Sequence, residues 1–392
     1  MDAHRLDRLK IAYLCDQSPL VPSTYSGGNT RMFKALQCHV GDVTLIDASW
    51  HLAEPVRRLM AILPEAVQLR ARWRLHYALA PMIARGVTRE IAKDQYDAVF
   101  CAYSLQSMSR VKTGPKVLRV FTSDATQTTY RQSEIGQVFG SYWSASRKLD
   151  AWVATNERRA LTSMDLLLWP SEWLHNLCLE TYGLRPDTCR VIPWGAGIDT
   201  WPRPGQPSPI GRDHPLNLLV VGRDWFAKGG PVAFETMTTL RDRGIDARLT
   251  VIGCTPPAFH RSAQVVVHPS LDKTRASDMK IFEQVFDTAH VMVMPSHESY
   301  GFAFCEASAY GVPSLCLRVG GIPIRDGING FALTNGSGPS DFADHIERLV
   351  ADPDGYVRLR QTTRAEFETR LNWDSWGKQV AHLIADLRAR QA

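Results

Sequence analysis

The feature of this sequence that most limits its fold is the alternation of short apolar runs with longer amphipathic stretches along most of its 392 residues. Such alternation predicts parallel strands joined by helices. The predicted strands fall into two series. The first covers residues 9–15, 43–46, 96–101, 116–121, 165–170 and 189–193, and the second covers residues 216–221, 247–252, 264–268, 290–295 and 313–317. The sequence therefore predicts an α/β protein with two doubly wound, Rossmann-like parallel sheets.

A stretch rich in proline and glycine, from Gly195 to Asn217, separates the two series. Its composition prevents regular structure. We therefore predict a first domain over residues 1–200, a linker over 201–215 and a second domain over 216–371. The ligand site is expected in the cleft between the domains, because such sheets bind ligands at the carboxyl ends of their strands. Residues 372–392 repeat bulky apolar side chains at helical spacing and predict a terminal amphipathic helix.

Composition excludes several classes of protein. The eight cysteines are scattered without a C-x-x-C pair, which favours reduced thiols over a disulfide framework or a zinc site. The first ten residues are too charged for a secretory signal, and no apolar run approaches the ~20 residues of a membrane-spanning helix. We expect a cytoplasmic protein that is soluble or peripheral to the inner face of a membrane.

The formal net charge of +5 is concentrated in one region, residues 56–93, where eight cations face only Glu65 and Glu90. The cations are Arg57, Arg58, Arg70, Arg72, Arg74, Arg85, Arg89 and Lys93. Because apolar residues are interleaved with them, this stretch could lie against an anionic membrane surface or polyanion. A solvated helix face is an equally good interpretation. No recognised motif supports binding to nucleic acid.

The segment from Leu216 to Met237 predicts a strand, a basic loop and a helix. Arg223 and Lys228 lie in the loop, and Gly229 and Gly230 precede the helix. Two cations beside the free N–H groups of a helix N-terminus form an anion site suited to a diphosphate. The alternative is a solvated surface loop.

The stretch from His297 to Pro313 predicts a loop followed by a helix. Gly301 permits a turn closed to other residues, after which the amides of residues Tyr300 to Phe302 would point out of the helix N-terminus. Glu306 lies one turn inside the helix, and its side chain leans back towards the loop. Since a carboxylate repels phosphate, we expect Glu306 to accept hydrogen bonds from a ribose diol and Glu298 to meet a sugar. Two acids, two hydroxyl-bearing rings and a diphosphate describe a nucleotide sugar. Alternatively, Glu298 is an ordinary loop acid and Glu306 a favourable charge near a helix start.

These residues resemble the retaining glycosyltransferases of the GT-B fold, specifically the group 1 family often called GT4. The matching motifs are E-x7-E at Glu298 and Glu306, G-R-x4-K-G from Gly222 to Gly229, the Gly27-Gly28 turn, and the run VIPWGAGIDT before the linker. The resemblance implies a hexosyltransferase that uses a UDP- or GDP-linked donor and retains anomeric configuration. It also implies that the terminal helix crosses back to the N-terminal domain.

The resemblance assigns roles to individual residues. Arg223 and Lys228 would bind the donor diphosphate, Glu306 the ribose and Glu298 the transferred sugar, with assistance from loop amides of Tyr300, Gly301 and Phe302. Gly28 would let backbone approach the donor phosphates. Base contacts are expected from residues 268–271, including Ser270 and Leu271.

No metal or other cofactor is expected from the resemblance. The only D-x-D sequence is Asp352-Pro353-Asp354, which reads as a turn between helices. Many relatives carry a His-Asp pair after the fourth strand, where this chain has Ser123-Asp124, so Asp124 is a catalytic candidate without the usual histidine. The acceptor would be a small molecule, a glycan or a lipid-linked compound, with roles in polysaccharide, glycolipid or glycoside synthesis.

Two other functions remain open from the sequence. One is a nucleotide-sugar epimerase of the same architecture, and the other is a nucleotide-sugar-binding protein without catalytic activity. A nicotinamide-dependent dehydrogenase is disfavoured because no G-x-G-x-x-G follows a predicted strand.

Overall fold

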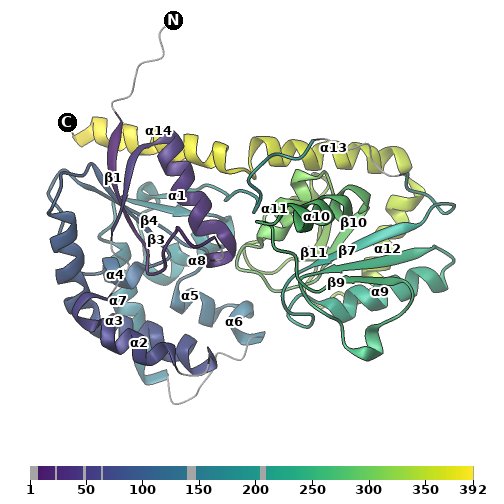
Figure 1. Ribbon diagram of the computed structural model, residues 1–392, viewed down its shortest axis with the longest axis horizontal. Helices are drawn as coiled ribbons and strands as arrows, with labels where there is room; N and C mark the ends of the chain where they lie inside the picture. Colours follow the sequence, from purple (N-terminus) through teal and green to yellow (C-terminus); the bar gives the residue numbers. More distant parts are fainter. Residues whose placement is uncertain are drawn as a thin grey trace, which may run out of the picture. The chain divides into compact units, whose positions relative to one another are not determined.

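The computed structural model describes residues 8–22, 24–46, 50–62, 65–138, 147–203 and 209–391, except for the side chains of residues 51, 61, 65–73, 138, 147 and 148. The chain divides into two units, each described by itself (Figure 1). Unit 1 comprises Met1–Trp194 and Trp373–Ala392, and unit 2 comprises Gly195–Asn372.

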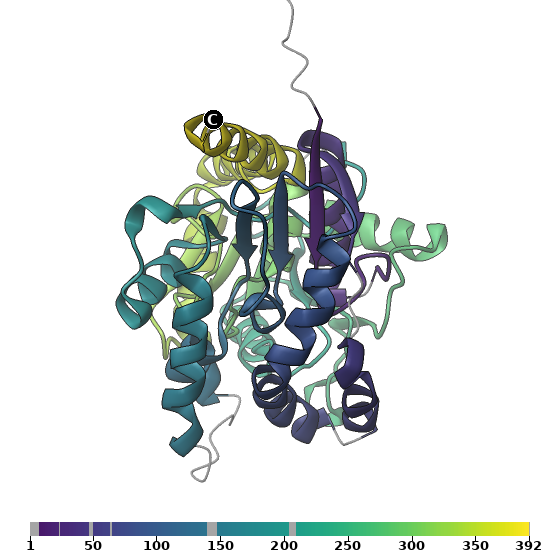
Figure 2. The same ribbon diagram turned by 90° about the vertical axis from the view of Figure 1, so that its left-hand side faces the viewer.

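Unit 1 is built on a parallel sheet that has the strand order β2-β1-β3-β4-β5-β6 within the described residues. The strands are β1 (Leu9–Leu14), β2 (Gly41–Leu45), β3 (Ala98–Ala102), β4 (Leu118–Thr122), β5 (Leu166–Trp169) and β6 (Cys189–Val191). Figure 2 shows strands of this sheet running side by side. The helices are α1 (Gly28–His39), α2 (Glu54–Ala61), α3 (Glu65–Ile91), α4 (Leu105–Met108), α5 (Gln127–Gln132), α6 (Glu134–Val138), α7 (Arg147–Leu161), α8 (Glu172–Tyr182) and α14 (Trp373–Gln391).

Helices cover both faces of this sheet, as apolar strands require when they are buried on both sides. On one face, Ala12, Val99 and Phe121 pack in a core with residues of α3, α4, α7 and α8. On the other face, Phe100 contacts Trp376 of α14, with 6.0 Å between ring centroids. The C-terminal helix therefore packs within unit 1, as the resemblance implied, and Figure 1 shows it beside α1.

Unit 2 carries the second sheet, with the order β12-β11-β10-β7-β8-β9 among the residues described. Its strands are β7 (Leu216–Val221), β8 (Ala247–Ile252), β9 (Val265–His268), β10 (Val291–Met294), β11 (Ser314–Leu317) and β12 (Gly330–Leu333). Its helices are α9 (Gly230–Asp242), α10 (Ala276–Thr288), α11 (Phe302–Ala309), α12 (Pro339–Ala351) and α13 (Pro353–Thr369). The prediction of two doubly wound parallel sheets is confirmed, and every predicted strand is present with each end within two residues of the predicted one.

Three details correct or extend the predictions. The edge strand β12 was missed; it has only four residues and begins with a glycine at φ 145°. The stretch 56–93 spans parts of two helices, α2 and α3. All eight cysteines are free, as predicted, and only Cys38 is exposed.

Candidate active site

The order of strands in unit 2 identifies where a ligand would bind. The chain moves outward from β7 through β8 to β9, then crosses to β10 on the opposite side of β7 and continues to β11 and β12. The order thus reverses between β7 and β10, and ligands of open α/β sheets bind beyond the carboxyl ends of the two strands at such a point. The loops that follow β7 and β10 carry the predicted residues Lys228 and Glu298.

The loop after β7 is compact because its own backbone closes it. The amide N–H of Lys228 donates to the carbonyl oxygen of Asp224 at 3.1 Å, and that of Gly230 donates to Trp225 at 2.8 Å. Gly229 has φ +70°, and a Cβ there would lie 2.4 Å from the carbonyl oxygen of Pro295. The glycine therefore lets this loop approach the one after β10. The amides of Gly229 and Gly230 both donate inside the turn, so they are not among the free N–H groups expected at the start of α9.

The cation of this loop reaches the predicted acid. Lys228 Nζ donates to Glu298 Oε1, which also accepts a hydrogen bond from Ser296 Oγ at 2.9 Å. The side chains are 27% and 13% exposed, so the pair is largely withdrawn from water. The stem of Lys228 lies against Gly222, where a Cβ would be 2.3 Å from Lys228 Cγ. The two motifs therefore form one arrangement at the switch point of the sheet.

The glycine before α11 fits the predicted turn. Gly301 has φ +88° and is the residue immediately before the helix. A side chain at this φ would be strained, and its Cβ would lie 2.6 Å from the ring of Phe304. Tyr300 is buried in the core. A contribution of Tyr300 to ligand binding would therefore come from its backbone.

The second acid, Glu306, has a partner that was missed from the sequence. Lys273, in the loop after β9, donates to Glu306 Oε1 at 2.5 Å, and its Nζ lies 4.3 Å from the ring centroid of Phe282. Glu306 is 5% exposed. A Cβ at Gly197 would lie 2.2 Å from Glu306 Oε1, so the backbone at Gly197 lies directly against the carboxylate of Glu306. The spacing of Lys273 and Gly197 in the sequence carries no pattern that would have indicated this contact.

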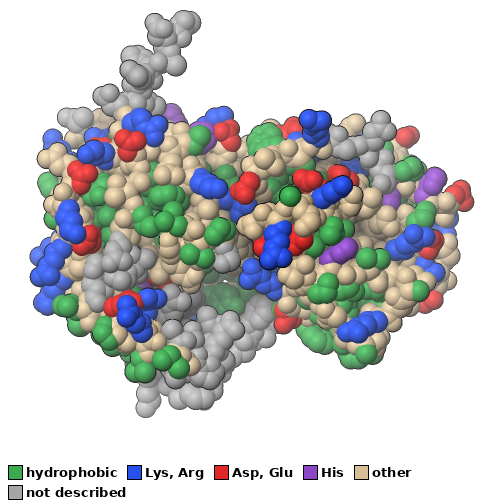
Figure 3. All heavy atoms as spheres, viewed as in Figure 1, with side chains coloured by type: hydrophobic (Ala, Val, Ile, Leu, Met, Phe, Trp, Pro, Cys, Tyr) green, Lys and Arg blue, Asp and Glu red, His purple; other side chains and the backbone are tan. Residues whose placement is uncertain are grey.

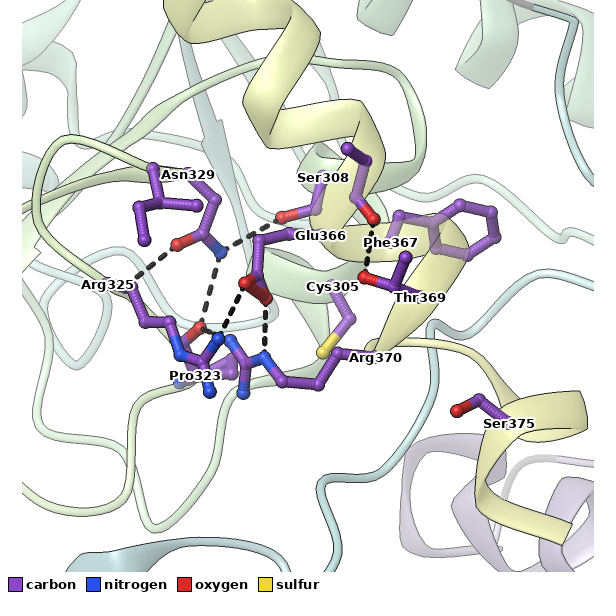
Figure 4. A network of polar contacts seen from close by, with 12 residues as sticks. Cys305, Ser308, Pro323, Arg325, Asn329, Glu366, Phe367, Thr369, Arg370 and Ser375 are labelled. Atoms are coloured by element: carbon purple, nitrogen blue, oxygen red, sulfur yellow. Dashed lines mark hydrogen bonds and ion pairs between the residues drawn. The ribbon is translucent and has the colours of Figure 1, made fainter. Parts of the chain in front are cut away.

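The backbone at Glu298 is tied to the segment that follows β11. The amide of Gly321 donates to the carbonyl oxygen of Glu298 at 3.2 Å. Beyond this glycine, Arg325 and Arg370 converge on Glu366 of α13 (Figure 4). Asn329 braces the same segment, because its side-chain amide donates to the carbonyl oxygen of Pro323 at 3.2 Å. These contacts stabilise the segment whose Gly321 amide holds the backbone of Glu298.

The other residues predicted in unit 2 lie on loops at the carboxyl ends of the strands. Arg223 is exposed and follows β7 by two residues. Ser270 is exposed and Leu271 half-buried in the loop after β9, in the same loop as Lys273. Asp352 caps the start of α13 by accepting from the amide of Gly355 at 2.9 Å, which supports the prediction of a turn at this D-x-D sequence.

Gly28 and Asp124 belong to unit 1, at the edge where β1, β3 and β4 end. The helix after the glycine pair begins at Gly28, and Gly27 is the glycine of the pair that has positive φ. Burial, and to a smaller degree the Asp124 carboxylate, raise the pKa of Tyr103.

Backbone strain gathers at the switch point of unit 1, between β1 and β3. Tyr25, Ser26 and Tyr103 have φ of 49°, 56° and 61°, a region that such residues seldom adopt. The rings of Tyr25 and Tyr103 stack with centroids 3.9 Å apart, and Tyr25 Oη donates to Asp16 Oδ1 at 2.7 Å. Strain at such residues is found mostly at functional sites.

Residues 56–93 carry less unpaired positive charge than their own composition indicates. Arg57 and Arg58 both pair with Glu54, which lies just before the range, and Lys93 pairs with Glu90. The side chains of Arg70 and Arg72 lie outside the described residues.

Within the described residues, no helix has the length and apolar character needed to cross a membrane. The same residues contain no group of three or more His, Cys, Asp or Glu placed to hold a metal ion.

Part of the chain is similar to known glycosyltransferases. The family described as glycosyl transferases group 1 matches residues 215–352. A D-inositol 3-phosphate glycosyltransferase of Xylanimonas cellulosilytica is 27% identical over 259 residues, which cover 60% of each chain. A protein of the same name from Streptomyces bingchenggensis is 38% identical over 104 residues, 26% of this chain and 22% of that one. The chain thus spans about three fifths of the length of the first relative.

Solved structures share the fold. Sucrose-phosphate synthase of Thermosynechococcus elongatus has a TM-score of 0.65 at 19% identity, covering 98% of this chain and 100% of that one. HepE of Anabaena, in complex with UDP, has a TM-score of 0.62 at 14% identity, covering 96% and 100%. The match over residues 215–352 includes the loops of Lys228, Lys273, Glu298 and Glu306. Residues 215–352 are therefore similar to the group 1 glycosyl transferases, and the two parallel sheets have the GT-B fold.

Proposed function

We propose that this protein is a retaining hexosyltransferase that moves a sugar from a UDP- or GDP-linked donor to an acceptor hydroxyl. The observation that carries the proposal is the contact between Lys228 and Glu298 at the switch point of unit 2. A cation and a sugar-facing acid at one point suit a ligand with a phosphate next to a sugar ring. The relatives named D-inositol 3-phosphate glycosyltransferase support glycosyl transfer, and the structure of HepE in complex with UDP supports a donor of this class.

In the proposed reaction, the bond between the sugar's anomeric carbon and the diphosphate oxygen breaks. The electron pair leaves with the diphosphate, where Lys228 and Arg223 stabilise the developing charge. Fixed charges aimed at a leaving group are commonly a large catalytic term. The acceptor oxygen then bonds to the anomeric carbon on the face that the leaving group vacated, and its proton passes to the departing phosphate. Glu298 would hold hydroxyls of the sugar in place.

This route assigns no protein nucleophile and no metal ion, because the two cations take the charge of the leaving group. Lys228 is already held by Glu298 before the donor binds, so its position is set in advance. Preorganised charge of this kind requires little rearrangement during reaction. The usual histidine near Asp124 is absent, so we place the sugar contacts on Glu298 and keep Asp124 as a candidate.

The acceptor is proposed to bind at unit 1, near Asp16, Tyr25 and Tyr103. The strained backbone of both tyrosines supports a functional role for this edge, and aromatic rings with a nearby carboxylate suit a polyhydroxylated compound. Replacement of Tyr25 with Ala is expected to raise KM for the acceptor and leave donor affinity unchanged. An unchanged KM for the acceptor would contradict this assignment.

We also propose peripheral contact with an anionic membrane through residues 56–93, which would bring a lipid-linked acceptor within reach. Val56, Leu59 and Ile62 are exposed at helical spacing on α2 and just after it. At the position of α2, Figure 3 shows Lys and Arg side chains beside apolar ones. An amphipathic helix of this kind binds the boundary between headgroups and acyl chains. Leu59→Glu should reduce sedimentation with vesicles of anionic phospholipid. If neither the unmodified chain nor the variant binds the vesicles more weakly as the salt concentration rises, the electrostatic contribution of the basic residues is refuted.

Product analysis tests the function as a whole. The protein is incubated with UDP- and GDP-hexoses, with and without candidate acceptors such as D-inositol 3-phosphate. We expect free UDP or GDP only in the presence of an acceptor, together with a glycosylated product that keeps the donor's anomeric configuration. A changed sugar still attached to the nucleotide would instead indicate an epimerase, and tight binding without turnover would indicate a binding protein.

A further inference from the structure

The contact between Lys273 and Glu306 sets how this acid can meet a ligand. Glu306 lies on the fifth residue of α11, and only its Oε1 is engaged in the contacts found among the described residues. Lys273 Nζ holds this oxygen at 2.5 Å. A buried carboxylate needs such a partner, because an isolated charge out of water is costly.

Lys273 is itself restrained from two sides. Its ammonium group lies 4.3 Å from the ring centroid of the buried Phe282 while it donates to Glu306. A cation over an aromatic face is attracted to it. The long and otherwise flexible lysine side chain is therefore fixed at both the ring and the carboxylate.

Gly197 restrains the carboxylate from a third direction. A Cβ at this position would be 2.2 Å from Glu306 Oε1 and 3.8 Å from Lys273 Nζ. Since Cβ atoms do not approach other atoms so closely, any other residue would displace the carboxylate or the segment at Gly197. The absence of a side chain at Gly197 is thus part of the geometry of Glu306.

We infer that Lys273 and Gly197 are positioning residues that hold Glu306 with Oε2 available to the vicinal diol of a nucleotide ribose. The inference rests on the proposed function. If it holds, Lys273 and Gly197 are responsible for the discrimination between ribose and deoxyribose nucleotides. A carboxylate oxygen fixed in this way accepts from a ribose hydroxyl at little cost in ordering, whereas a mobile carboxylate would lose much of that gain.

The test measures the dissociation constants of UDP, GDP and their 2′-deoxy forms by calorimetry. The proteins are the full chain, Lys273→Met, Lys273→Arg and Gly197→Ala, with Lys280→Met as the matched control. Lys280 is an exposed residue of α10, so the control removes the same charge elsewhere in unit 2. Far-UV circular dichroism checks that each variant is folded.

The unmodified chain is expected to bind at least one ribonucleotide about tenfold or more tightly than its 2′-deoxy form, the size of one hydrogen bond to a charged group. Lys273→Met and Gly197→Ala should bring this ratio close to one. Lys273→Arg should retain much of it, and Lys280→Met should retain all of it. If Lys273→Met loses the preference for the ribonucleotide while Lys273→Arg keeps part of it and Lys280→Met keeps all of it, the effect comes from the positioning of Glu306 and not from a general loss of positive charge.

Two results would overturn the inference and leave the proposed function intact. They are nucleotide binding without discrimination in the unmodified chain, and undiminished discrimination in a folded Lys273→Met. If neither UDP nor GDP binds to the unmodified chain, the proposed function fails and the inference fails with it.

Discussion

Replacing Lys228 with Met tests the arrangement on which the proposed chemistry depends. The substitution keeps much of the stem that packs against Gly222 and removes the charge that holds Glu298. Because the two side chains are 27% and 13% exposed, their ion pair lies between a surface pair and a buried one. Surface pairs contribute about 0–1 kcal/mol and breaking buried pairs costs about 3–5 kcal/mol. We therefore expect the variant to lose about 1–2 kcal/mol of unfolding free energy.

The effect on function should be larger than the effect on stability. A charge-assisted hydrogen bond to a phosphate contributes about 1.5–3 kcal/mol, so the dissociation constant for the donor should rise about 10- to 150-fold. If Lys228 also stabilises the leaving group, kcat should fall by a further factor of about 10²–10³. Calorimetry with UDP and GDP gives the first quantity, and steady-state kinetics with the active donor give the second.

A double-mutant cycle with Glu298→Gln separates the ion pair from the contacts with a ligand. The unfolding free energies should show a coupling of about 1 kcal/mol or more between the two positions, since they are in direct contact. Lys280→Met serves again as the charge-matched control. A folded Lys228→Met protein that binds nucleotide and turns over donor like the unmodified chain would refute the reasoning.

Three further substitutions probe the scaffold, each by urea unfolding. Gly229→Ala should cost about 2 kcal/mol or more, because it combines a positive φ with a steric clash, whereas Gly244→Ala, with φ +83° and open space, should cost about 1 kcal/mol. Asp352→Ala removes the cap that accepts from Gly355 and should cost about 1 kcal/mol. Burial raises the pKa of Glu157 above 4.5, so the folded protein binds the proton of this carboxyl group more tightly than the unfolded chain does. The stability that the protonated group contributes is therefore lost as the pH rises through the folded pKa. Glu157→Gln, which cannot ionise, should not show this pH-dependent loss.

Each of these predictions has a result that contradicts it. If Gly229→Ala and Gly244→Ala lower the unfolding free energy equally, the close approach of Gly229 to Pro295 does not add to the cost of a side chain at this position. A neutral Asp352→Ala would show that water replaces the cap. For Glu157, the difference in unfolding free energy between the variant and the unmodified chain should shift in favour of the variant as the pH rises above 4.5. A difference that is constant with pH would contradict the raised pKa.

Much of the fold and part of the candidate site were predictable from local pattern. Buried parallel strands read as continuous apolar runs, so even the four residues of β10 stand out in the sequence. Gly301 marks a turn with positive φ, as its position suggested, and Gly229 also has positive φ. Strand β12 was missed because four residues that begin with glycine carry little periodic signal.

Other features depend on contacts between distant segments. Free N–H groups were expected at the start of α9, but the amides of Gly229 and Gly230 donate to Phe226 and Trp225. Lys273 and Glu306 are 33 residues apart, and Gly197 lies in a segment that the sequence marks only as irregular. Neither spacing nor composition can predict such a contact, since it depends on how loops from different strands pack.

The amino-acid sequence by itself determined the two parallel sheets, the loops at their carboxyl ends, and the residue types that suit a phosphate and a sugar. Those properties follow from apolar periodicity, turn residues and side-chain chemistry, which act over a few residues. Tertiary structure alone decided the pairing of each acid with its lysine and the closure of Gly197 over Glu306. The physical reason is that a buried charge must find a partner wherever the packing of the chain supplies one.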